Sequence, residues 1–64
     1  MEYTVSYYVK AKGVVIHCTK TIGPSMWHVE RFVEGLEDLL FGTVTRENEA
    51  GEDILVSEFM YRDL

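Results

Sequence analysis

The sequence predicts an α+β fold with the element order ββαββ, in which one amphipathic helix packs on one face of a four-stranded antiparallel sheet. Two patterns indicate it. Apolar residues repeat at helical spacing between Pro24 and Gly42, while the segments on both sides alternate polar and apolar residues as strands do. A sheet is the natural cover for the apolar stripe of a single helix. A chain of 64 residues forms one domain, which we place at 1–64.

The first two strands are expected to form a hairpin. Residues 2–10 alternate and are rich in β-branched and aromatic side chains, which pack well in a sheet. A short turn at 11–13 follows, in which Gly13 is free to adopt positive φ. The second strand then begins at Val14.

The helix is expected over about 25–41. Ser25 is the preferred N-cap, and Gly23 followed by Pro24 at the first helical position is the alternative. Gly42 fits the left-handed residue that ends many helices. The apolar stripe that would face the sheet consists of Val29, Phe32, Val33, Leu36, Leu39 and Leu40.

Two more strands are predicted, at 43–47 and from Ile54 to Arg62, with a polar loop between them. The pattern does not determine the order of the strands. The last strand would carry Ile54, Val56, Glu58 and Met60 on one face and Leu55, Ser57, Phe59 and Tyr61 on the other, so both faces are mostly apolar.

This lack of alternation has two interpretations. In one, the last strand is central or wraps its ends over the core; in the other, its outer face binds a partner or a second copy. The candidate self-association residues are Tyr8, His17, Phe59 and Tyr61. Self-association would also help a domain of this size, because its core is small.

The outer face of the predicted helix is acidic and carries the only tryptophan. Steps of about 100° place Trp27 about 160° from Val29, on the solvent side, where Arg31 is spaced to stack on its ring. Alternatively, the first turn is irregular and Trp27 folds back over the hairpin. The acidic residues of this face are Glu30, Glu34, Glu37 and Asp38. Glu34 forms like-charge pairs with Glu30 and Asp38 at i,i+4 spacing, and Glu37 and Asp38 lie near the negative end of the helix dipole.

The partner-binding residues predicted from this face are Trp27, Glu30, Arg31, Glu34 and Asp38. Such a surface suits a basic protein partner. The alternative is that it is simply a solvated helix face. The six basic and eleven acidic residues leave a formal net charge of −5, which disfavours nucleic acid.

Catalytic and metal chemistry find little support in the sequence. His17 and Cys18 are neighbours on a strand, so their side chains should point to opposite faces. The two histidines and the lone cysteine have no metal-ligand spacing, and the five glycines form no phosphate loop. We therefore expect no enzyme, no cofactor and no metal site. A lone cysteine, without a secretory segment or an apolar run of membrane-spanning length, favours the cytoplasm.

The leading functional hypothesis is a small acidic protein-binding module. In size, charge and element order it is similar to the loose class of small acidic α+β proteins of phages, which often bind and inhibit a host enzyme. That resemblance implies a phage- or bacterium-encoded regulator that occludes a host protein, and it assigns no residue. The alternatives are a structural homo-oligomer that pairs through its terminal strands, and a nucleic-acid-binding module that uses the lysines and tyrosines of the hairpin.

Overall fold

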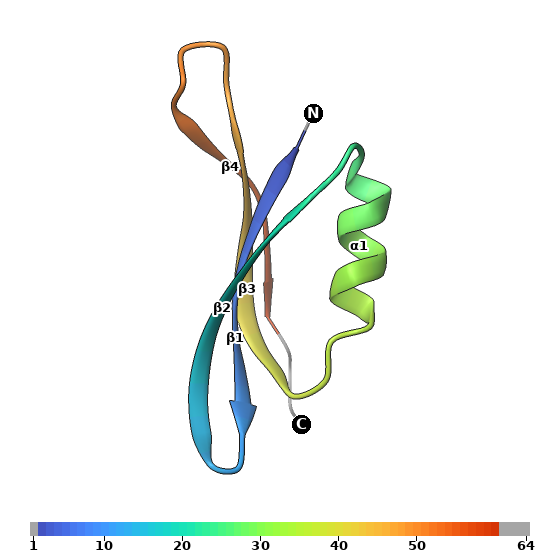
Figure 1. Cartoon of the computed structure of the whole chain (residues 1–64), viewed down its shortest axis with the longest axis vertical. Coiled ribbons are helices and arrows are strands. Elements are labelled where there is room, and N and C mark those ends of the chain that lie inside the picture. The colour runs from blue at the N-terminus through green and yellow to red at the C-terminus, as the bar shows by residue number, and fades with distance from the viewer. Residues whose placement is uncertain (1, 61–64) are drawn as a thin grey trace.

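The chain folds into one four-stranded antiparallel sheet with a helix on one face, in the predicted order ββαββ (Figure 1). A computed structural model describes residues 2–60. The elements are β1 (Tyr3–Ala11), β2 (Val14–Ile22), α1 (Met26–Glu34), β3 (Leu39–Glu47) and β4 (Asp53–Met60). The predicted fold class is therefore confirmed.

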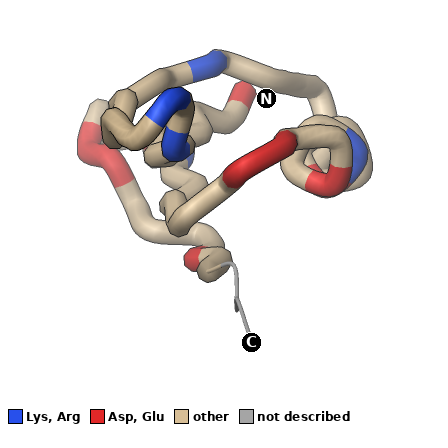
Figure 2. The backbone as a smooth tube through the Cα atoms, turned by 90° about the horizontal axis from the view of Figure 1, so that it is seen from below, with Lys and Arg blue, Asp and Glu red and all other residues tan. Residues whose placement is uncertain are grey.

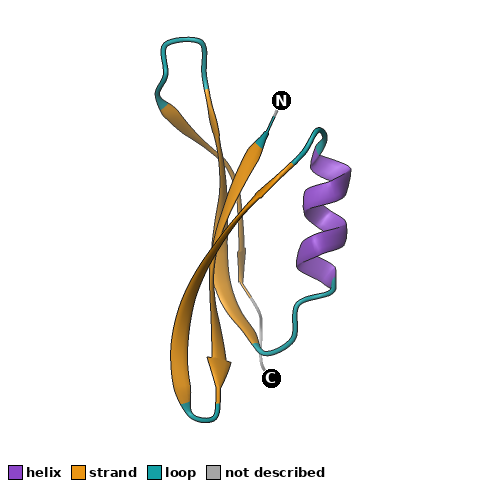
Figure 3. Cartoon of the chain, viewed as in Figure 1, coloured by secondary structure: helices purple, strands orange, loops and turns teal. Residues whose placement is uncertain are grey.

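The strands lie in the order β2-β1-β3-β4, so β1 and β3 are central and β2 and β4 are the edges. Figure 3 shows the strands with the single helix on one side of them. The first hairpin is confirmed, with nine continuous pairs from Tyr3↔Ile22 to Ala11↔Val14. Its turn consists of Lys12 and Gly13, at φ 52° and φ 79°. Two residues with positive φ are typical of the type I′ turn, whose twist matches that of the strands.

The helix is shorter than predicted, and its expected extent of about 25–41 is wrong. α1 ends at Glu34, and Gly35 is its C-cap, with an N–H that donates to the Phe32 carbonyl at 3.2 Å. Glycine lowers helix propensity, and the carboxylates of Glu37 and Asp38 would oppose the helix dipole if the helix continued. Asp38 instead adopts φ 57°, and its carbonyl accepts the Lys10 N–H at 3.0 Å.

The residues expected in the last helical turns belong to β3 instead. β3 begins at Leu39, four residues before the predicted 43–47, and Gly42 lies inside this strand rather than at the end of the helix. A short apolar run such as Leu39 to Phe41 fits helix and strand equally well, so its spacing did not separate the two. The preferred N-cap, Ser25, is confirmed, although its hydroxyl bonds the His28 ring at 3.0 Å and not a backbone N–H.

The last strand lies at an edge, which contradicts a central position, and its predicted alternation is also wrong. The register shifts between Val44 and Thr45, leaving Val56 as an extra residue on β4. One extra residue exchanges the faces on either side of it. Ser57 and Phe59 therefore share the helix-covered face with Ile54, whereas Leu55 shares the open face with Glu58 and Met60. Tyr61 and Arg62, the predicted end of the strand, lie outside the described residues.

The core is small and sits where α1 crosses the two central strands. Val29 of α1, Val5 of β1 and Val44 of β3 are at most 1% exposed. Around them pack the partly buried Tyr3, Tyr7, Ile22, Met26, Phe32, Val33 and Phe59. A nine-residue strand is about 30 Å long and a nine-residue helix about 14 Å, so both hairpins extend past the helix (Figure 1). The radius of gyration, 12.3 Å, exceeds the roughly 11 Å of a compact chain of this length.

Gly42 is required by a close approach on the helix-covered face. A Cβ built on it would lie 2.5 Å from the Phe59 ring and 2.7 Å from the Ser6 carbonyl oxygen. No side chain fits there unless β1 or Phe59 moves. Gly35, by contrast, has φ −87°, and a Cβ built on it would meet its nearest neighbour, the Phe32 carbonyl, at an ordinary 3.6 Å.

We therefore expect the matched variants Gly42→Ala and Gly35→Ala to differ in sign. Gly42→Ala should lower the free energy of unfolding by about 1–3 kcal/mol, as overpacking does. Gly35→Ala should leave it unchanged or raise it by up to about 1 kcal/mol, because alanine restricts the unfolded chain. Urea denaturation of both proteins measures this difference. Equal unfolding midpoints would contradict the close approach of Phe59 to Gly42.

Candidate functional site

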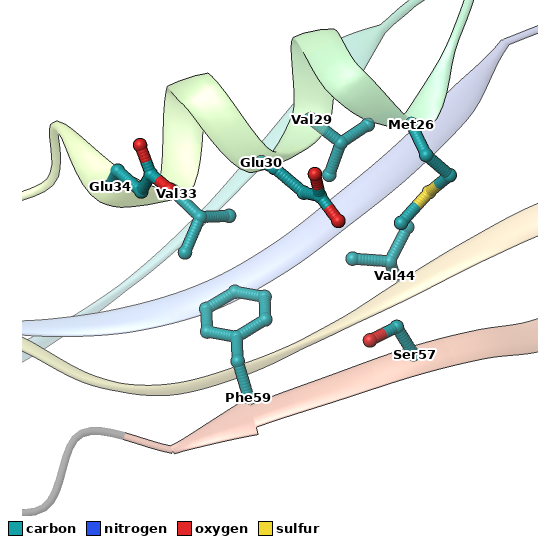
Figure 4. Close-up of a pocket in the computed structure, with 8 residues that line it drawn as sticks. All are labelled: Met26, Val29, Glu30, Val33, Glu34, Val44, Ser57 and Phe59. Carbon is teal, nitrogen blue, oxygen red and sulfur yellow. The ribbon is translucent and has the colours of Figure 1, made fainter.

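An open groove of about 400 Å³ lies beside α1, on the side of β4 (Figure 4). Its walls and floor are mostly apolar, and two carboxylates stand on the helix side. The lining residues are Met26, Val29, Glu30, Val33, Glu34, Val44, Ser57 and Phe59. Figure 4 shows the Glu30 carboxylate directed from α1 toward the strands, next to the methionine side chain.

The groove exists because the sheet is wider than its cover. α1 packs mainly over β1. β4 is two strands away from β1, so α1 does not cover β4, although it lies on the same side of the sheet. Gly42 of β3 and Ser57 of β4 have small or no side chains, so little side-chain volume fills the groove above these two strands. Phe59 fills part of the space and remains only partly buried. A partner side chain placed here would contact apolar surface that the fold leaves uncovered.

The acidic rim continues past the end of the helix. A second hollow shares Val33 and Glu34 with the groove and adds Glu37 and Asp38 from the connection to β3. Figure 2 shows acidic residues on α1 and in the loop that follows it, and most basic residues away from the helix; one basic residue lies on α1, and further acidic residues lie on the far side. The rim therefore forms a continuous negative edge beside an apolar floor.

Trp27 lies on the outward face of α1, as predicted, with 58% of its surface exposed. The alternative in which it folds back over the hairpin is wrong. The Arg31 guanidinium carbon lies 5.3 Å from the centre of the indole ring, so the predicted cation–π pair is also present. Arg31 is the only lysine or arginine of the helix, and this pairing places it over the tryptophan.

The structure brings together four of the five predicted partner-binding residues. Helical steps of about 100° place Glu34, Arg31 and Glu30 within about 60° of Trp27. Asp38 lies beyond the end of the helix and joins the set only through the second hollow. The apolar floor of Val44 and Phe59 was missed by the sequence analysis. Gly35, read as the end of the helix, would have moved residues 39–42 into the strand, but no signal marks the extra residue at Val56 that turns Phe59 to this side.

The open face of the sheet carries a row of stacked rings that crosses three strands. Tyr8 of β1 lies between His17 of β2 and Phe41 of β3, with ring centroids 4.6 Å and 4.7 Å apart. The Ser6 hydroxyl and His17 Nε2 share a hydrogen bond of 2.7 Å. Met60, 74% exposed, continues the row on β4 opposite Phe41.

This row includes only two of the four predicted self-association residues. Tyr8 and His17 lie on the open face, but Phe59 points to the opposite, helix-covered face, because it is paired with Gly42. Tyr61 lies outside the described residues. Phe41 was missed because it was assigned to the helix. Reading 39–47 as one strand would have placed Phe41 in the sheet, and the pairing of β3 with β1 then sets it opposite Tyr8.

The same stacking bears on the nucleic-acid alternative. Single strands bind sheets through aromatic faces on which bases stack. Both faces of the Tyr8 ring are occupied by its neighbours, at interplanar angles of 23° and 24°. Only the outer faces of His17 and Phe41 remain for a base. The row therefore offers a base the rings at its two ends and not the central Tyr8 ring.

His17 and Cys18 do point to opposite faces, since they pair with Tyr8 and Tyr7 respectively. No group of three metal-ligating side chains occurs within residues 2–60. In the same residues, no helix is long and apolar enough to cross a membrane. Comparison with protein-family models, with curated proteins and with solved structures found no match.

The fold raises the pKa of the Tyr7 hydroxyl. Burial raises the pKa of its hydroxyl above 10.0, and Cys18 raises it further through its charge and a hydrogen bond. The Tyr7 ring packs edge-on against Phe32 at 5.6 Å, which places the phenol at the junction of helix and sheet. The folded state therefore favours the neutral phenol.

We expect this raised pKa to appear as a loss of stability in alkali. A group with a raised pKa in the folded state contributes its stabilisation below the unfolded value and loses it as the pH rises through the folded value. The free energy of unfolding should therefore fall above about pH 10, and Tyr7→Phe should fall less steeply. Urea titrations on either side of this pH measure both slopes. Identical slopes would contradict a raised pKa of the Tyr7 hydroxyl in the folded state.

Proposed function

We propose that this protein is a binding module for a basic, partly apolar segment of another protein, which it occludes. The observation that carries the proposal is the groove beside α1, with its apolar floor and the carboxylates of Glu30 and Glu34 at its rim. Such a site suits a segment that places an apolar side chain on Phe59 and Val44 and a lysine or arginine beside each carboxylate.

The outward residues of the helix extend this contact. Tryptophan and arginine are among the residues most enriched in binding hot spots, and the Trp27–Arg31 pair lies next to the acidic rim. The pairing with Arg31 limits the rotamers of the indole, which lowers the entropy lost on binding. We assign the groove the role of an anchor for the partner and Trp27 that of a second anchor outside it.

Electrostatics support the same class of partner. The net charge of −5 attracts a basic segment over a distance of about a Debye length and raises the association rate. An acidic surface that takes up a basic segment prevents that segment from binding elsewhere. This is the basis for proposing a regulator or inhibitor. A phage or bacterial origin is proposed only from the resemblance in size, charge and element order. The lone cysteine is in keeping with a reducing cytoplasm, where we place it.

The experiment uses two synthetic peptides of equal length that differ only in charge. One has leucine and lysine at helical spacing, and the other carries glutamate in place of each lysine. We expect the basic peptide alone to shift the NMR signals of the Val29, Val33 and Val44 methyl groups, because these line the groove. Shifts confined to other residues, or equal shifts with both peptides, would contradict the proposal.

Charge reversal separates the rim from the net charge. Glu30→Lys with Glu34→Lys should weaken binding of the basic peptide by about tenfold or more, because the rim would then repel it. The control, Glu49→Lys with Glu52→Lys, changes the net charge equally in the exposed loop between β3 and β4. Isothermal titration calorimetry compares the two. If both pairs of substitutions weaken binding equally, the groove is not the site.

A further inference from the structure

The outer edge of β2 is a long strand edge to which no other described strand is paired. β2 ends the sheet order, and its nine residues pair only with β1. An uncovered edge presents a row of free backbone N–H and C=O groups, which form a template for another strand. Water satisfies these groups in the monomer, and a second strand would satisfy them as well.

The two edges of the sheet differ in how well they are protected. β4 carries a register shift at Val56 and the exposed charges of Asp53 and Glu58, which are features that discourage pairing. β2 has a continuous register and no proline, and its only formally charged residue is Lys20. The pairing edge is therefore β2. The sequence analysis expected pairing through the terminal strands, which are β1 and β4. β2 is not one of these strands, and β1 lies in the middle of the sheet.

We propose that β2 pairs antiparallel with β2 of a second copy, about a twofold axis at Cys18. Cys18 is the midpoint of Val14–Ile22, so this register alone pairs all nine residues. It places Cys18 opposite Cys18 of the second copy. Moving the axis to residue 17 or 19 would leave only seven residues of β2 paired, 14–20 or 16–22. The product is one continuous eight-stranded sheet.

The hydrogen-bonding pattern of the first hairpin fits this register. A two-residue turn makes Ala11↔Val14 a hydrogen-bonded pair, and such pairs then alternate along the ladder. Cys18↔Tyr7 is therefore a hydrogen-bonded pair, and the backbone groups of Cys18 point inward. The outward groups belong to the residues at 15, 17, 19 and 21. The proposed axis pairs residue 17 with 19 and 15 with 21, so outward groups meet outward groups.

The side chains that meet across this axis are compatible. On the helix-covered side Val14 lies opposite Ile22, and Ile16 lies opposite Lys20, so no like charges face each other. Val14 and Ile16 are 59% and 43% exposed in the single chain, because the hairpin extends past the helix, and Val15, on the open face, is 56% exposed. Pairing covers part of this apolar surface, which the core of one chain leaves in water.

Disulfide cross-linking tests the register. Under mild oxidation at tens of micromolar, the unmodified chain should form a Cys18–Cys18 dimer, since residues of a non-hydrogen-bonded pair have side chains close enough to bridge. In a Cys18→Ser background, Ile16→Cys and Lys20→Cys should cross-link rapidly when the two proteins are mixed and only slowly when each is alone. Equal rates in the mixture and in the separate proteins would overturn the proposed register.

A charge pair tests the interface without a cysteine. His17→Glu with Thr19→Glu places carboxylates opposite each other across the axis and should weaken the dimer by roughly tenfold. His17→Glu with Thr19→Lys modifies the same two sites but pairs opposite charges, and it should restore the dimer. Sedimentation equilibrium measures both, and circular dichroism verifies that both fold. A monomeric unmodified chain, or equal weakening in both variants, would overturn the proposal.

Discussion

The contact of Val29 with Val5 and Val44 holds the helix on the sheet, and the remaining structure depends on it. These three side chains are almost fully removed from water, and each comes from a different element. The two valines of the sheet are direct neighbours, since Val5 pairs with Val44. A core of this size stabilises only the middle of a sheet whose strands are twice the length of the helix. The ends of the hairpins and the margin beside β4 remain exposed as a direct consequence.

Much of the exposed apolar surface follows from the small size of this core. Nine large hydrophobic residues are exposed in the described chain, and they lie on the sheet, except for Trp27. Val14 to Ile16 lie near the end of one hairpin and Ile54 to Val56 near the end of the other, and all six are exposed. Small domains often compensate for a limited core by association. The groove, the open face and the β2 edge are therefore three surfaces that stay exposed because the core is small.

The elements with clear periodicity were predictable, and those that depend on a single residue were not. Alternation over 2–10 and the turn at Gly13 identified the first hairpin, and the outward position of Trp27 followed from helical spacing. The end of the helix was not predictable from the apolar pattern, since Leu36 and Leu39 continue it past Gly35. The bulge at Val56 leaves no signal in a chain of apolar residues, yet it determines which face Phe59 occupies. The groove depends on both the end of the helix at Gly35 and the extra residue at Val56.

The two proposed surfaces lie on opposite margins of the sheet and do not compete. The groove is beside β4, and the pairing edge is β2, separated from it by the two central strands. A dimer through β2 would therefore carry two grooves, one at each end of an eight-stranded sheet. Both helices would lie on the same face of that sheet, because a twofold axis normal to the sheet preserves the face. A partner with two basic segments would then bind both grooves, and its second binding event would be intramolecular. Dimerisation would in this way increase the apparent affinity of a groove that is shallow on its own.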